Sequence, residues 1–170
     1  MKRIHIIGRK NHGKTTLVVD LVKELSRRGL KIGTIKHTHH QHELDTPGKD
    51  SHRHRLAGSA CVGILSPSMN ACFWPVDQEG ESRYAVFDTH FSDCDLLLVE
   101  GDTQTSADRI EVWRAAVGGD PLASQDTSIA AIVADAGSLT DLPIPMLNRA
   151  DLAGVANWIC HRLDIQPNGS

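Results

Sequence analysis

The feature that most constrains the fold of this chain is a glycine-rich stretch near the N-terminus, GRKNHGKTT at residues 8–16. It follows the apolar segment IHII (4–7) and runs into TTLVVDLVKELSRRG (15–29), where leucines recur every four residues and a glycine ends the pattern. A strand, a glycine-rich loop and an amphipathic helix in this order fit the phosphate-binding motif G-x-x-x-x-G-K-[ST]. The sequence therefore predicts a loop whose backbone N–H groups surround phosphate, next to the positive end of a helix dipole.

The motif gives its residues different roles. Gly8 and Gly13 let the backbone turn tightly and approach phosphate, because a Cβ atom would be in the way. Lys14 would contact the β- and γ-phosphate oxygens, and Thr15 would place its hydroxyl on Mg²⁺. Three further positions of this stretch are nucleotide-binding candidates: Asn11, His12 and Thr16.

DLLLVEG at residues 95–101 supplies the acid that such a loop needs to order magnesium or a magnesium-bound water. Glu100 lies at the carboxyl end of this apolar segment, where ligands of open α/β sheets bind, and is preferred to Asp95 for that reason. We expect Glu100 to be a magnesium ligand and, with Lys14, a catalytic residue. The alternative is a solvent-exposed acid at the end of a strand.

Other short, partly β-branched apolar segments indicate strands of a parallel sheet that is covered on both faces. They lie at KIGTI (31–35), CVGIL (61–65) and IAAIV (129–133). Helices are expected at SHRHRLAG (51–58) and ADLAGVANWICHRL (150–163). The alternation predicts an α/β protein with one three-layer P-loop NTPase domain over residues 1–170 and a mostly parallel central sheet.

Residues 66–91 interrupt this alternation. NACFWPV (70–76) and SRYAVFD (82–88) are interpreted as the arms of a β-hairpin around the turn-rich DQEGE. The segment gathers aromatic side chains in a chain that has only 4% of them. We therefore predict a hairpin extension at about 66–91 that forms a homodimer or partner surface. The alternative is a hairpin folded back on its own core.

The histidine-rich segment IKHTHHQHELDTPGKDS (35–51) contains three nucleotide-binding candidates, His37, Asp45 and Lys49. One interpretation is a nucleotide-responsive loop that faces the γ-phosphate, with Asp45 also a magnesium ligand. A second is a zinc or nickel site built from imidazoles and a carboxylate. A third is a polar, flexible loop.

The net charge of −3 and the pI of about 6.3 argue against a general affinity for nucleic acid. No apolar run reaches the length of a membrane span, and the N-terminus lacks a signal-peptide pattern, so we expect a cytoplasmic protein that does not bind membranes. The four cysteines form no CxxC pair. They indicate neither a disulfide framework nor a thiolate zinc site, and we expect reduced, mostly buried thiols.

Five blocks of the sequence together resemble the MobB family of molybdopterin-guanine dinucleotide biosynthesis adaptors: GRKNHGKTT, IKHTHH, DTPGKDS, RLAGSA and LLLVEG. The resemblance runs from residue 3 to about residue 101, and more loosely to the final helix. It implies a P-loop protein with GTP and Mg²⁺ as cofactors, forming a homodimer through a β extension. It also implies that the protein assists the molybdopterin guanylyltransferase of MobA type that attaches GMP to molybdopterin, and that molybdopterin-bearing proteins are further partners.

The chain departs from the family after VEG, where a Phe-Lys pair is common and this sequence reads DTQTSADR. Two positions compete for the guanine base. Asp135 follows the apolar segment 129–133 and is a nucleotide-binding candidate, whereas NRAD (148–151) is similar to the base-reading motif N-K-x-D. Asn148 and Asp151 fit helix caps equally well.

The sequence shows no obvious catalytic glutamine or arginine finger, so at most weak GTP hydrolysis is expected. Three other protein classes stay open at this point, one of which is a structural interaction module that binds nucleotide without turnover. A P-loop small-molecule kinase would need arginines over the phosphates, for which RHR (53–55) is the candidate. A metal-delivery GTPase is suggested by the ten histidines, although the cysteine-containing metal motifs of such proteins are missing.

Overall fold

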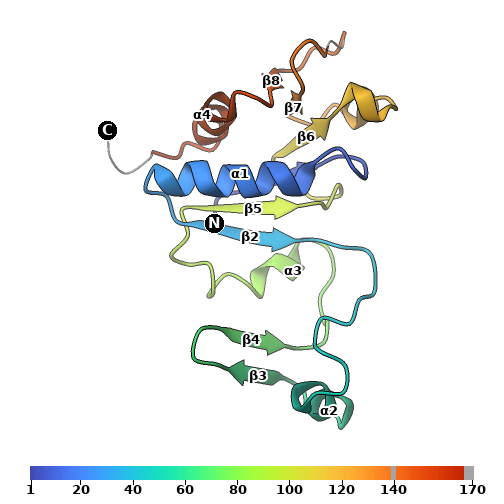
Figure 1. Cartoon of the computed structure of the whole chain (residues 1–170), viewed down its shortest axis with the longest axis vertical. Coiled ribbons are helices and arrows are strands. Elements are labelled where there is room, and N and C mark those ends of the chain that lie inside the picture. The colour runs from blue at the N-terminus through green and yellow to red at the C-terminus, as the bar shows by residue number, and fades with distance from the viewer. Residues whose placement is uncertain (139–140, 167–170) are drawn as a thin grey trace. The chain divides into compact units, whose positions relative to one another are not determined.

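The computed structural model describes residues 1–138 and 141–166. Contacts divide the chain into two compact units. The sheet unit consists of Met1–Thr38 and Tyr84–Ser170, and the insert unit is His39–Arg83 (Figure 1). The expectation of one domain over the whole chain stays a prediction.

The sheet unit is built on six strands in the order β2-β5-β1-β6-β7-β8, and every neighbouring pair is parallel. The strands are β1 Arg3–Ile7, β2 Ile32–Lys36, β5 Leu96–Glu100, β6 Arg109–Trp113, β7 Ala131–Ala134 and β8 Met146–Asn148. The predicted α/β fold with a mostly parallel central sheet is confirmed, including strands near 31–35 and 129–133. Because β1 lies between β5 and β6, the loop that follows β1 emerges at the middle of the sheet's carboxyl edge.

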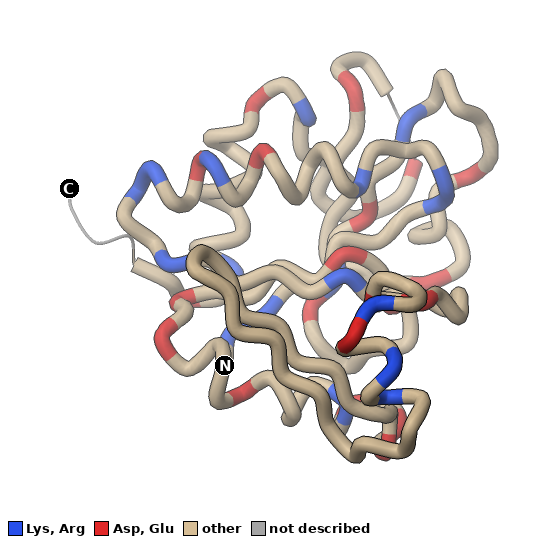
Figure 2. The backbone as a smooth tube through the Cα atoms, turned by 60° about the horizontal axis from the view of Figure 1, so that its bottom comes forward, with Lys and Arg blue, Asp and Glu red and all other residues tan. Residues whose placement is uncertain are grey.

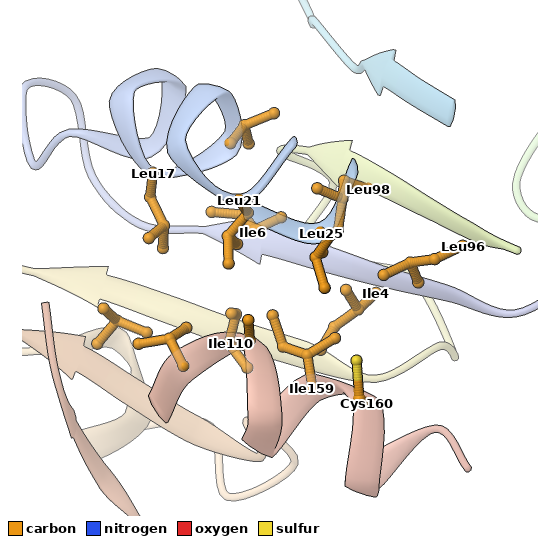
Figure 3. Close-up of a cluster of buried hydrophobic side chains, with 14 of the residues drawn as sticks. Ile4, Ile6, Leu17, Leu21, Leu25, Leu96, Leu98, Ile110, Ile159 and Cys160 are labelled. Carbon is orange, nitrogen blue, oxygen red and sulfur yellow. The ribbon is translucent and has the colours of Figure 1, made fainter. Parts of the chain in front are cut away.

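Two helices cover one face of this sheet, α1 (Lys14–Arg27) and α4 (Leu152–Arg162). The leucines at every fourth position of α1 are fully buried, and Figure 3 shows them against Ile4 and Ile6 of β1 and Ile159 of α4. The leucine periodicity therefore correctly identifies the buried face of α1. No helix among the described residues is long and apolar enough to cross a membrane.

Shorter segments cover the opposite face. Leu97 and Val99 of β5 pack there against Tyr84, which lies in the one-turn helix α3 (Ser82–Ala85). A second apolar cluster on β6 and β7 is covered by the 3₁₀ helix η2 (Leu122–Ser124), and another 3₁₀ turn, η1, spans Ala115–Val117. The flanking segments give the sheet unit three layers.

The insert unit contains α2 (Asp50–Leu56) and an antiparallel hairpin of β3 (Val62–Leu65) and β4 (Asn70–Phe73). A hairpin is therefore present, but the arms predicted for it are wrong in part. CVGIL is not a strand of the parallel sheet but forms the first arm, and SRYAVFD is not extended but begins with α3. The turn lies at 66–69, where Ser66 N–H donates to the Met69 carbonyl.

The cysteines also differ from expectation. Cys61 and Cys72 are exposed, Cys94 is half-buried, and Cys160 is the buried one. The expectation of mostly buried thiols is therefore wrong. The hairpin provides the physical reason, because Cys61 directly before β3 and Cys72 in β4 belong to a pair of strands whose side chains are mostly exposed.

Candidate nucleotide site

The loop between β1 and α1 has the backbone that its glycines predict. Gly8 has a φ of 142°, and a Cβ atom there would lie 2.5 Å from the Val112 carbonyl oxygen of β6. Gly13, the N-cap of α1, has a φ of 93°, and Asn11 between them has a φ of 70°. The left-handed positions and the close approach to β6 mean that the loop needs glycine at Gly8.

Lys14 and Thr15 begin α1 and turn in different directions. The Lys14 ammonium donates to the carbonyl oxygens of Gly8 and Arg9, each at 2.8 Å, so it lies over the loop. Burial lowers the pKa of Lys14, with Glu100 opposing that shift and Lys36 adding to it. Its cationic group thus donates to two neutral carbonyl oxygens, and an anionic ligand would replace these bonds favourably.

The structure brings Thr15 and Glu100 together, as the sequence predicts for a magnesium site. The Thr15 hydroxyl donates to Glu100 Oε1 at 2.7 Å, and Glu100 ends β5 beside β1. A hydroxyl and a carboxylate are hard oxygen donors of the kind that Mg²⁺ prefers, with phosphate oxygens and water completing its shell. The residues present therefore fit a magnesium ion bound together with a nucleotide.

His12 has a structural role that the sequence did not indicate. Its side chain is buried, and its Nδ1 accepts a hydrogen bond from Arg114 N–H at 3.0 Å. Burial lowers the pKa of His12, and the cations Lys14, Arg9 and Arg114 lower it further, which favours the neutral imidazole. The side chain fastens the loop to the end of β6. Contacts of His12, Asn11 and Thr16 with a nucleotide stay predictions.

Arg149 was missed by sequence reasoning and lies directly beside the loop. Both terminal nitrogens of its guanidinium are 3.4 Å from the Gly13 carbonyl oxygen. A Cβ atom on Gly13 would lie 3.0 Å from the nearer one. Among the described residues no carboxylate forms an ion pair with Arg149, unlike Arg114, which pairs with Asp135 at 3.0 Å. The signal in the sequence was an arginine directly after a strand, at the carboxyl edge of the sheet.

A hollow of about 230 Å³ lies at the carboxyl ends of β7 and β8. Its lining includes Asp135 and Asn148. Asn148 Oδ1 accepts a hydrogen bond from Ala150 N–H, and Asp151 Oδ1 accepts one from Gly154 N–H, each at 2.9 Å. The cap interpretation of NRAD is therefore confirmed for Asp151, the N-cap of α4. Asp135 is the carboxylate that faces the hollow.

The three candidates from the histidine-rich segment are divided between the two units. His37 follows β2 in the sheet unit and donates its backbone N–H to the Glu100 carbonyl at 2.9 Å. Asp45 and Lys49 lie in the insert unit. Asp45 is buried and accepts hydrogen bonds from Thr46 N–H and the Ser51 hydroxyl, at 2.7 and 2.9 Å.

Lys49 is the N-cap residue of α2. The proposed contacts of His37, Asp45 and Lys49 with phosphate or magnesium stay predictions. Within residues 1–138 and 141–166 no three His, Cys, Asp or Glu side chains gather closely enough to hold a metal ion.

Comparisons with known proteins agree on one family. The family described as "Molybdopterin guanine dinucleotide synthesis protein B" matches residues 3–135. A molybdopterin-guanine dinucleotide biosynthesis adapter protein of Escherichia coli is 33% identical over 150 residues, covering 86% of this chain and 85% of the relative. An adapter protein of the same description from Haemophilus influenzae is 31% identical over 160 residues. The alignment covers 92% of this chain and 88% of that relative.

Solved structures agree with this assignment. A crystal structure of molybdopterin-guanine biosynthesis protein B aligns with a TM-score of 0.73 at 25% identity, covering 95% of this chain and 99% of that one. Bacillus subtilis MobB has the same fold, with a TM-score of 0.74 at 20% identity over 96% of this chain and 98% of its own. The chain therefore belongs to the MobB family, the molybdopterin guanine dinucleotide synthesis protein B family.

Proposed function

We propose that this protein is a GTP-binding adapter of molybdopterin-guanine dinucleotide biosynthesis, which binds GTP with Mg²⁺ at the loop between β1 and α1. Family membership supports the adapter role, since the relatives from Escherichia coli and Haemophilus influenzae carry that description. The observation that carries the nucleotide proposal is the contact of Thr15 with Glu100 at the mouth of a glycine-dependent loop.

Different groups of the loop would bind different parts of the triphosphate and its magnesium ion. Backbone N–H groups from the loop and the start of α1 would bind phosphate oxygens. Lys14 would exchange its bonds to the Gly8 and Arg9 carbonyls for bonds to phosphate, and charge-assisted hydrogen bonds are stronger than neutral ones. Bound Mg²⁺ would neutralise phosphate charge. Thr15 and Glu100 would bind the magnesium ion or a water molecule coordinated to it.

The guanine base would occupy the hollow beside Asp135. A carboxylate accepts hydrogen bonds from the N1 and N2 hydrogens of guanine, whereas adenine offers no such pair of donors on that edge. The Arg114 guanidinium would orient Asp135 through their 3.0 Å contact. Arg149 extends from the strand that lines the hollow to Gly13 of the phosphate loop, so it would contact the nucleotide between base and phosphates.

Hydrolysis is expected to be weak, because neither 8–16 nor 95–101 contains a glutamine that could orient an attacking water. Binding of GTP rather than its turnover would then regulate the adapter. Its partners would be the molybdopterin guanylyltransferase of MobA type and molybdopterin-bearing proteins, in the cytoplasm.

The hairpin is the surface that we assign to a second copy of the chain. No charged residue occurs between Leu56 and Val76 (Figure 2). Five of the eight exposed large hydrophobic side chains of the described residues lie in the insert unit, including Leu65 at 86% and Met69 at 73% exposure. Natural sheets protect exposed edge strands with charged side chains. An uncharged apolar hairpin is therefore expected to pack against another protein surface.

A valine at position 15 tests the nucleotide proposal. Thr15→Val keeps the shape of the side chain but removes the hydroxyl, so GTP binding should lose its dependence on Mg²⁺ and weaken at least about tenfold with magnesium present. Isothermal titration calorimetry with and without Mg²⁺ measures this. Thr34→Val on β2 is the matched control, because Thr34 is exposed and distant from the loop in the sequence. Equal magnesium dependence in both variants would contradict the proposed site.

A further inference from the structure

Two of the four cysteines meet on the β3–β4 hairpin. Cys61 lies directly before β3, Cys72 lies in β4, and their sulfur atoms are 3.1 Å apart. Both thiols are free and exposed. The nucleotide site uses neither of them, and their wide separation in the sequence gave no motif. In the single chain they form a solvent-exposed dithiol on the hairpin that is assigned above to a second copy.

The strand register places both thiols on one face of the hairpin. Gly63 lies directly opposite Cys72, and Cys61 is two residues before Gly63, so its side chain points to the same side. Gly63 has no side chain to compete with Cys61 for the space beside Cys72. The Ser59 hydroxyl donates to the Cys61 carbonyl at 2.8 Å and holds the chain just before β3.

The distance between the sulfurs favours a bond between them over a shared metal ion. Two thiolates bound to one tetrahedral Zn²⁺ at about 2.3 Å keep their sulfurs about 3.8 Å apart. The observed 3.1 Å is shorter than that. Among the described residues no third His, Cys, Asp or Glu joins the pair to complete a metal site.

We propose that Cys61 and Cys72 form a reversible intramolecular disulfide by exchange with a low-molecular-weight disulfide of the glutathione class. One cysteine thiolate attacks a sulfur of oxidised glutathione, which releases one glutathione thiolate and leaves a mixed disulfide. The second cysteine thiolate attacks the protein sulfur of that mixed disulfide and displaces the second glutathione. The protein loses two electrons, oxidised glutathione gains them, and the two thiol protons end on the two released glutathione molecules.

The bond would fix the open end of the hairpin. It would close a loop from residue 61 to residue 72 that contains β3, the turn at 66–69 and β4 up to Cys72. Such a link restricts the open states of the hairpin, so amide hydrogens of β3 and β4 should exchange at least about tenfold more slowly after oxidation. Because the bond is exposed, it should form in an oxidising glutathione mixture and open in a reducing one.

The test uses the reduced full-length protein and glutathione buffers of defined ratio. After acid quenching and alkylation, mass spectrometry should show that the wild type loses two free thiols without gaining glutathione, and peptide mapping should find Cys61 joined to Cys72. Cys61→Ser and Cys72→Ser cannot complete the second step, so the glutathione adduct should be at least about tenfold more abundant in each than in the wild type. Cys94→Ser is the matched control and should behave as wild type.

Two results would overturn the inference. One is a wild type in which Cys61 and Cys72 carry glutathione to the same extent as in the single variants, because the second step would then be absent. The other is a disulfide between two chains, visible as a dimer on a non-reducing gel. The peptide map of the wild type decides the question even if a serine variant folds poorly, and it does not depend on GTP binding.

Discussion

At the scale of single residues, the loop at 8–16 depends on two kinds of constraint. Gly8 is required because a Cβ atom would approach the Val112 carbonyl to 2.5 Å. Lys14 and Thr15 are instead chosen by chemistry, since one supplies a cation beside the loop and the other a hydroxyl beside Glu100. The need for glycine fixes the backbone of the loop, and the ammonium and hydroxyl groups give that backbone side chains suited to phosphate and magnesium.

Arg149 allows a prediction at this scale. Arg149→Ala should weaken GTP binding about tenfold, or about 1.4 kcal/mol, because its guanidinium, which pairs with no carboxylate of the described residues, would otherwise bond to the nucleotide. Arg149→Lys should recover part of the loss. Fluorescence titration with a labelled GTP measures both variants, and thermal unfolding checks that the fold is intact. Arg27→Ala, an exposed arginine at the end of α1, serves as control. Equal affinities for all three variants would remove Arg149 from the site.

The residues found from sequence were those with a fixed spacing along the chain. The glycines, Lys14 and Thr15 belong to one continuous motif, and Glu100 ends an apolar strand, so local rules were enough. Arg149 follows Lys14 by more than a hundred positions and reaches Gly13 only because β8 and α4 bring it there. The burial of His12 has the same origin in tertiary contacts, which no local pattern encodes.

At the scale of elements, the sequence predicted α1 and four of the six parallel strands, β1, β2, β5 and β7, because their apolar patterns are regular, whereas β6 and β8 were not predicted. CVGIL was misassigned because a short continuous apolar run looks the same in a buried strand and in a hairpin arm. In the structure Leu65, at the end of that run, is 86% exposed. The aromatic residue Tyr84 was assigned to the hairpin, yet it packs on Leu97 and Val99 of the sheet unit.

Tyr84, in helix α3, allows a prediction at the scale of elements. Its hydroxyl donates to Asp102 Oδ2 at 2.6 Å, and Asp102 has a φ of 60°. Burial raises the pKa of Asp102, but hydrogen bonds from the Tyr84 hydroxyl and Gln104 N–H, together with the nearby His37 and His5, outweigh burial and lower the pKa below 3.8. Tyr84→Phe should therefore reduce the free energy of unfolding by about 1–2 kcal/mol at pH 7.

The pH dependence of this effect has a definite sign. The folded-state pKa of Asp102 is depressed, so its contribution is present above pH 3.8 and is lost as pH falls through the folded value. The difference between wild type and Tyr84→Phe should shrink in that range. Urea unfolding at pH 7 and below pH 4 measures it. A difference that is the same at both pH values would show that the charge of Asp102 plays no part.

At the scale of the whole molecule, the two units differ in what they bury and what they expose. The sheet unit has the buried core and the candidate nucleotide site, whereas Val62 is the buried apolar side chain of the hairpin strands. The sequence shows that the stretch between Leu56 and Val76 carries no charge. It does not show which side chains of this stretch are exposed, because the predicted hairpin paired 70–76 with 82–88, whereas β4 pairs with β3. The exposed apolar hairpin supports assembly with a second copy.

A charge on the hairpin tests this assembly. Leu65→Asp should convert a dimer to monomers at micromolar concentration while each chain stays folded, because Leu65 is already exposed in the single chain. Sedimentation velocity measures the change. Val117→Asp is the matched control, since Val117 is an exposed apolar residue of the sheet unit. A wild type that is monomeric under these conditions, or two variants that dissociate equally, would contradict the assignment.

The most direct test of the central claim is a binding titration of GTP against ATP, with and without Mg²⁺, on the wild type and on Lys14→Ala. We predict that GTP binds more tightly than ATP and that binding requires magnesium. Lys14→Ala should weaken GTP binding at least about tenfold, because the ammonium beside the Gly8 and Arg9 carbonyls is lost. Preference for ATP, or GTP affinity that Lys14→Ala leaves unchanged, would contradict a GTP-binding adapter.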